Sequence, residues 1–119
     1  VEVPKPNVSH QAVWMRCLDR LPDDASLHRA ALAYASDYTI LESIYRRHGV
    51  AWATEGLRAA SLDHAMWFHR PFRVDEWLLY HCEGVASAGA RGLARGSFYT
   101  REGELVVSVA QEGLMRVLA

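Results

Sequence analysis

The amino-acid sequence predicts an α+β fold, in which one helical region precedes an antiparallel meander of strands. Apolar residues recur at helical spacing between Leu27 and His48. The second half of the chain instead holds four runs rich in aromatic or β-branched residues, separated by short turn signals. One block of helix followed by one block of strands favours α+β over an alternating α/β fold.

Length and composition indicate a single globular domain. The chain has 119 residues, of which 50% are hydrophobic and 23% charged, and its net charge is −1. This charge argues against a nucleic-acid-binding face, since phosphate binding requires a concentrated basic patch. No apolar stretch approaches the ~20 residues that span a bilayer. No leader is recognisable and Cys17 and Cys82 are expected to be free thiols, so we expect a cytoplasmic location.

The first half of the chain divides into an arm, a strand and the helical region. Residues 1–10 are expected to form a linker or extended arm, because two prolines occur among the first six residues, and one domain is expected over residues 11–119. A strand is predicted over Ala12–Leu18, and Ser26 is the predicted N-cap of the helical region. This region is either one helix or two joined near residues 36–37, and Gly49 is a natural terminator.

The second half is predicted to form four strands with turns between them. The strand-like runs are "AASLDHAMWFH", "EWLLYHCEGVASA", "RGLARGSFYTR" and "LVVSVAQEGLMRVL". The turn signals are "RPFRVD", "GA" at residues 89–90 and "REGE".

Asp37 is an acid inside a run of small and apolar residues, "AYASDYTI". If the helix continues through it, the positions three and four residues away place it on the buried stripe, with Ala33, Tyr34, Ile40 and Leu41. A buried charge costs several kcal/mol unless partners or protonation offset the loss of water. Asp37 is therefore either a residue that takes part in the chemistry of the protein or the N-cap of a second helix beginning at Tyr38.

Two further polar residues and a possible metal cluster occur in the strands. Period-two alternation places Gln111 on the apolar face of the last strand, where it serves either a structural hydrogen bond or a functional one. Ser61 is expected near the start of a strand, where its hydroxyl forms a turn or cap unless it has a chemical role. Asp63, His64 and His69 do not suit a metal, because the first two point to opposite faces. We therefore expect neither a metal nor a cofactor.

Three candidate functional residues remain when the reaction types with recognisable motifs are excluded: Asp37, Ser61 and Gln111. The sequence has no nucleophile elbow, phosphate-binding loop or dinucleotide fingerprint. An acid, a hydroxyl and an amide can hold and polarise a water molecule without a covalent intermediate.

The stretch "SLDHAMWFHRPFRVDEWLLY" resembles the acyl-CoA thioesterase II family, the TesB-like enzymes, with "DHAMWFHRPF" as its most specific block. The resemblance continues through "RGLARGSFYTREGELVVSVAQEGLMR" and upstream through "LAYASDYTIL". It implies a hotdog fold, an antiparallel sheet wrapped around a central helix. It also implies that acyl-CoA is the substrate and is hydrolysed to a free fatty acid and CoA.

The resemblance implies a water-binding site made of three residues. The family's acid corresponds to Asp37 in "SD", its hydroxyl residue to Ser61, where threonine is the usual form, and its amide to Gln111 in "QEG". These are the residues that the pattern analysis had already singled out.

One departure from the family concerns length. Its members are longer and contain a second hotdog repeat, and this chain corresponds to the C-terminal repeat, with its proline-rich start resembling the linker. We therefore expect a homo-oligomer or pairing with an N-terminal hotdog repeat.

Two other functions and one binding role stay open at this point. The chain could be a non-catalytic fragment that binds acyl-CoA or a partner. A hotdog hydratase is disfavoured, since only His48 follows Asp37 at short range. Four arginines could meet the CoA phosphates or serve as solvated surface charges: Arg46, Arg47, Arg70 and Arg73.

Overall fold

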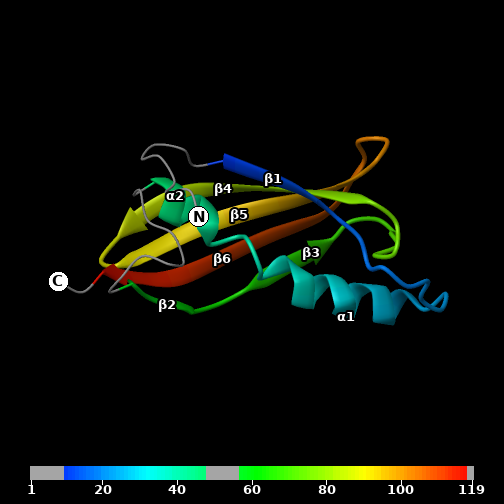
Figure 1. The fold of residues 1–119 in the computed structure, drawn as a ribbon, viewed down its shortest axis with the longest axis horizontal. Helices are drawn as coiled ribbons and strands as arrows, with labels where there is room; N and C mark the ends of the chain where they lie inside the picture. Colours follow the sequence, from blue (N-terminus) through cyan, green and yellow to red (C-terminus); the bar gives the residue numbers. More distant parts are fainter. Residues whose placement is uncertain (1–9, 48–56, 118–119) are drawn as a thin grey trace.

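A computed structural model describes residues 10–47 and 57–117 and shows one curled antiparallel sheet with two helices (Figure 1). The elements are β1 (His10–Met15), α1 (Ala25–Ser36), α2 (Glu42–Arg47), β2 (Leu57–Ser61), β3 (Ala65–Phe68), β4 (Leu78–Ala88), β5 (Arg91–Thr100) and β6 (Leu105–Val117). The strand order is β1-β4-β5-β6-β2, and β3 also pairs with β6. The fold class is α+β, and the curled sheet around a helical segment is a hotdog fold, as expected.

The long strands β4, β5 and β6 form the centre of the sheet and are joined by tight turns. Gly89 and Ala90 both have a φ of 61°, which is typical of a two-residue hairpin whose twist matches that of the strands. The turn before β6 contains Gly103 with a φ of 89°. Both turn predictions are confirmed.

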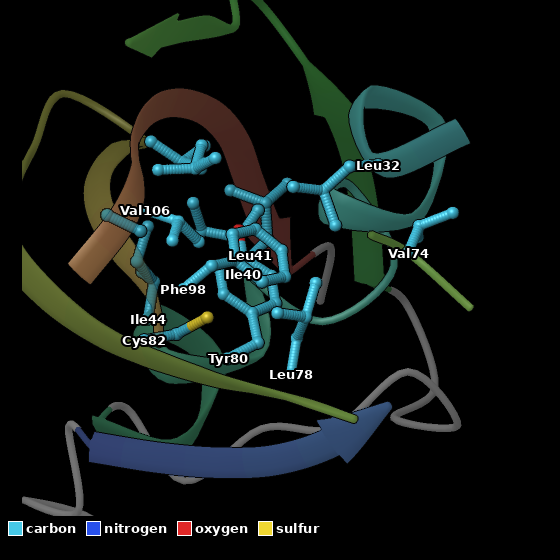
Figure 2. Packing of buried hydrophobic residues seen from close by; sticks show 13 residues of the cluster. Leu32, Ile40, Leu41, Ile44, Val74, Leu78, Tyr80, Cys82, Phe98 and Val106 are labelled. Carbon is cyan, nitrogen blue, oxygen red and sulfur yellow. The ribbon is translucent and has the colours of Figure 1, made fainter. Parts of the chain in front are cut away.

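The hydrophobic core lies between the concave face of the sheet and the helical segment (Figure 2). Tyr80 of β4 and Phe98 of β5 are paired in register, and their rings stack with centroids 3.9 Å apart. The helical segment covers them with four buried side chains, namely Leu32, Ile40, Leu41 and Ile44. Gly92 in β5 allows this close approach, because an added Cβ would lie 2.5 Å from the Ile44 side chain.

The helical region is broken after Ser36, where the sequence allowed either one continuous helix or two helices. α1 ends at Ser36, and α2 begins at Glu42 rather than at Tyr38. The N-cap of α1 is Asp24, whose carboxylate accepts the backbone N–H of Ser26, so the assignment of Ser26 as N-cap is wrong. Residues 1–9 of the arm predicted over residues 1–10 lie outside the described residues, as do His48 and the terminator Gly49, whereas His10 belongs to β1.

Two strand boundaries also differ from the prediction. β1 covers His10–Met15 instead of Ala12–Leu18. The run "AASLDHAMWFH" splits into β2 and β3, so Ser61 ends a strand and does not begin one. The split between β2 and β3 has its cause in β6, with which both strands pair. There the backbone N–H of Glu112 donates to the Asp63 carboxylate at 2.7 Å and is not available for pairing with a neighbouring strand. In the described part of the chain, neither helix is long and apolar enough to cross a membrane.

Candidate active site

Asp37, Ser61 and Gln111, which lie on three separate segments, meet in one hydrogen-bonded cluster. The Nε2 atom of Gln111 donates to Asp37 Oδ1 at 2.7 Å and to Ser61 Oγ at 2.8 Å. The Ser61 hydroxyl donates to the same Asp37 oxygen at 3.1 Å. The carboxylate is thus held by an amide and a hydroxyl.

Strand register places two of these side chains. Ser61 of β2 pairs with Gly113 of β6, and Gln111 lies two residues before that glycine on the same face. Gln111 is fully buried, as the period-two pattern predicted. Asp37 lies in the break between α1 and α2 and reaches both side chains from this third segment.

Asp37 itself is exposed, so the expectation that it lies on a buried stripe is wrong. Its backbone forms the C-cap of α1, with its N–H bonded to the Ala35 carbonyl, and the chain turns away from helical geometry beyond it. The buried polar residue at this helix end is its neighbour Ser36. Asp37 therefore keeps contact with water, and only its partner Gln111 is withdrawn from solvent.

Two residues that sequence reasoning did not assign to the site extend the cluster. His64 Nδ1 hydrogen-bonds Gln111 Oε1, and His64 Nε2 lies 2.8 Å from Ser36 Oγ. The Ser36 hydroxyl donates to the Ala33 carbonyl at 2.8 Å, and the Ser36 carbonyl accepts from the Tyr80 hydroxyl at 2.8 Å. The available signals were the dipeptides "SD" and "DH", which place Ser36 and His64 beside residues already noted.

The cluster opens into a surface depression of about 430 Å³ with an aromatic rim. Tyr34 and Tyr38 are 71% and 59% exposed, and their rings meet edge-on with centroids 5.3 Å apart. Leu62, which is 50% exposed, lies on the other side. The hydrogen bond to Tyr34 raises the pKa of Tyr38 above its usual value.

The carboxylate of Asp63, at the edge of the depression, and that of Glu112 in β6 affect each other's protonation. The backbone N–H of Glu112 holds the pKa of Asp63 below its usual value. The adjacent Asp63 carboxylate raises the pKa of Glu112 by hydrogen bonding and repulsion. Asp63 is therefore a structural acceptor for the backbone of β6.

The remaining candidate residues have other partners. Arg73 binds the Asp75 carboxylate and the Leu21 carbonyl, and Arg70 donates to the Leu105 carbonyl at 2.9 Å. The side chains of Arg46 and Arg47 lie outside the described residues. In residues 10–47 and 57–117, no three His, Cys, Asp or Glu side chains are placed to hold a metal ion.

Both cysteines are free thiols, as predicted. Cys82 is fully buried, and burial raises the pKa of its thiol to about 12. It is therefore not an activated nucleophile.

Comparison with known proteins decides the family. The family profile described as acyl-CoA thioesterase matches residues 5–114. The chain belongs to the acyl-CoA thioesterase family. The resemblance recognised in the "DHAMWFHRPF" block is thereby confirmed.

Relatives within the acyl-CoA thioesterase family are considerably longer than this chain. Acyl-coenzyme A thioesterase 8 from Mus musculus is 41% identical over 108 residues, covering 90% of this chain and 33% of that protein. Acyl-CoA thioesterase 2 from Haemophilus influenzae is 33% identical, covering 91% of this chain and 38% of that protein. The crystal structure of an acyl-CoA thioesterase II, TesB2, from Mycobacterium marinum matches with a TM-score of 0.81 and 47% identity, over 100% of this chain and 45% of that chain.

Proposed function

We propose that this chain carries the catalytic residues of an acyl-CoA thioesterase, with Asp37, Ser61 and Gln111 acting on a water molecule. The observation that carries the proposal is that Ser61 and Gln111, from two separate strands, both donate to the Asp37 carboxylate at the mouth of a depression. Membership of the acyl-CoA thioesterase family supports it and indicates an acyl-CoA substrate.

Asp37 is the proposed general base. Within the described part of the chain, both donors reach its Oδ1 atom, so its Oδ2 atom can accept a hydrogen bond from water. As the water oxygen attacks the thioester carbonyl, Asp37 takes its proton. The carbon–sulfur bond then breaks, and the proton passes to the departing sulfur. The products are a free fatty acid and CoA.

Ser61 and Gln111 orient the base and the water. Gln111 and the Ser61 hydroxyl restrict the rotation of the carboxylate, which preserves the geometry for attack. Ser61 Oγ retains a lone pair that can accept from the water molecule. The exposure of Asp37 fits this scheme, because water and the thioester must both reach it.

A second hotdog unit is proposed to close the depression. Tyr34, Tyr38 and Leu62 form an apolar rim that is half or more exposed, which is a poor environment for an acyl chain. The chain also spans only 33% and 38% of the thioesterases from Mus musculus and Haemophilus influenzae described above. The partner is a second copy of this chain or an N-terminal hotdog repeat. Oligomeric state by light scattering tests the first possibility, and a monodisperse, active monomer contradicts it.

The test is release of free CoA from medium-chain and long-chain acyl-CoA, followed by thiol detection. Asp37→Asn keeps the side-chain shape but removes the base, so we expect a loss of about 10²–10⁴-fold in kcat. Asp19→Asn, at an exposed carboxylate outside the site, serves as the matched control and retains full activity. Equal activity of Asp37→Asn and the wild type would refute the assignment.

The alternative is a non-catalytic hotdog that binds acyl-CoA but needs another repeat for turnover. The exposed aromatic rim, which leaves the depression open to solvent, favours this alternative over other classes of function. It predicts acyl-CoA binding by calorimetry without release of CoA from the folded wild type. The cytoplasmic location stays a prediction, and one relative, from Saccharomyces cerevisiae, is named a peroxisomal acyl-coenzyme A thioester hydrolase.

A further inference from the structure

We infer that His64 is a positioning residue of this site, which holds the Gln111 amide in the one orientation that presents Nε2 to Asp37 and Ser61. The inference rests on the proposed roles of those two residues. It stands on the hydrogen-bonded chain from Ser36 through His64 to Gln111.

A glutamine amide has two orientations of nearly the same shape, and its neighbours decide between them. On one side of Gln111 lies the Asp37 carboxylate, which can only accept while it is ionised. On the other side lies His64 Nδ1, next to Gln111 Oε1. The carboxylate therefore selects the orientation with Nε2 toward it, and this orientation requires a proton on His64 Nδ1.

The opposite ring nitrogen has a partner that suits this tautomer. With the proton on Nδ1, neutral His64 accepts at Nε2, and the Ser36 hydroxyl supplies that hydrogen bond over 2.8 Å when its single proton turns from the Ala33 carbonyl to the ring. Ser36 and Gln111 are both fully buried, so water does not readily replace either contact. The histidine ring itself is exposed at the edge of the depression.

The need for His64 arises during turnover. Once Asp37 has taken the proton of the attacking water, it can donate as well as accept, and it no longer selects one orientation of Gln111. A flipped amide would present Oε1 to Asp37 and remove the Gln111 donor, so that only the Ser61 hydroxyl would still hold Asp37. The His64 N–H opposes this flip, because it would then face the amide nitrogen.

Two variants of the same size separate a donor from an acceptor at this position. His64→Asn keeps an N–H near the place of Nδ1, and we expect its kcat to stay within about tenfold of the wild type. His64→Asp puts an acceptor there and favours the flipped amide, so we expect kcat to fall by about 100-fold with little change in KM. His69→Asp is the matched control, because it adds the same charge beside Ser108 of β6, outside the cluster, and should retain activity.

Equal losses in His64→Asn and His64→Asp, or no loss in either, would overturn the inference. A loss in the His69 control as large as that in His64→Asp would do the same, because it would assign the effect to charge alone.

A spectroscopic measurement tests the inference without any activity. ¹⁵N NMR of the histidine side chains in the wild-type chain, assigned with His64→Asn, should show neutral His64 protonated at Nδ1. A proton on Nε2 would overturn the inference even in an active enzyme. If the wild type hydrolyses no thioester, this result still decides the role of His64, whereas loss of activity in Asp37→Asn alone concerns the proposed function.

Discussion

The hydroxyl group of Tyr80 connects the core to the candidate site, and its removal has a calculable effect. It donates at 2.8 Å to the carbonyl of Ser36, the last residue of α1 and the neighbour of Asp37. The last carbonyls of a helix have no partner within the helix, and this one is satisfied by Tyr80. Tyr80→Phe removes the donor but retains the ring that stacks on Phe98.

The expected cost follows from an unsatisfied buried acceptor. Ser36 and Tyr80 are both fully buried, so the carbonyl has little access to replacement water. Such a group costs about 1–3 kcal/mol in the free energy of unfolding. For 119 residues the entropy of unfolding is about 0.25 kcal/mol/K, so Tm should fall by about 4–12 °C.

Thermal unfolding followed by circular dichroism and urea titration measure this effect. Tyr99→Phe is the matched control, since Tyr99 is half-buried and adjacent to Phe98 in β5, where alternation turns it to the other face. We expect the control to change stability by less than about 0.5 kcal/mol. If Tyr80→Phe is no less stable than Tyr99→Phe, the assigned role of the Tyr80 hydroxyl is wrong.

Two other substitutions test the fold. Gly92→Ala places a Cβ 2.5 Å from Ile44 and should cost about 1–3 kcal/mol in urea unfolding, whereas unchanged stability would show that α2 shifts freely. Asp75 has a pKa held well below its usual value by the Arg73 guanidinium and then by the Leu21 N–H, so its contribution to stability is present above about pH 4 and is lost as pH falls. Asp75→Asn should therefore be less stable at pH 7 and approach the wild type in strong acid, and a stability difference independent of pH would contradict this reasoning.

Local patterns sufficed for the parts of the fold that depend on near neighbours in sequence. Period-two alternation in the last strand placed Gln111 on the buried face, and the glycine at 103 and the pair 89–90 marked the turns. The three candidate residues were selected from the chain as polar groups in apolar surroundings and from the family resemblance, and the structure brings them together. Their catalytic role stays a prediction.

Other features depended on contacts between distant segments. The split between β2 and β3 follows from the Asp63 carboxylate taking a backbone donor from Glu112, 49 residues away. His64 entered the cluster because this split leaves it outside both strands, next to Gln111. Strand periodicity had placed it on a continuous strand and therefore could not predict that contact.

The sequence by itself determined the fold class through short-range periodicity, and it determined the family and the candidate acid, hydroxyl and amide through residue types together with the family resemblance. Only the tertiary structure decided that Asp37 is exposed to water while Ser36 is buried. The two residues are adjacent, and the side chains point into different environments because α1 ends between them. The tertiary structure also decided the orientation of the Gln111 amide. That orientation is set by Asp37 on one side and His64 on the other, which are separated from Gln111 by 74 and 47 residues and meet it only after folding.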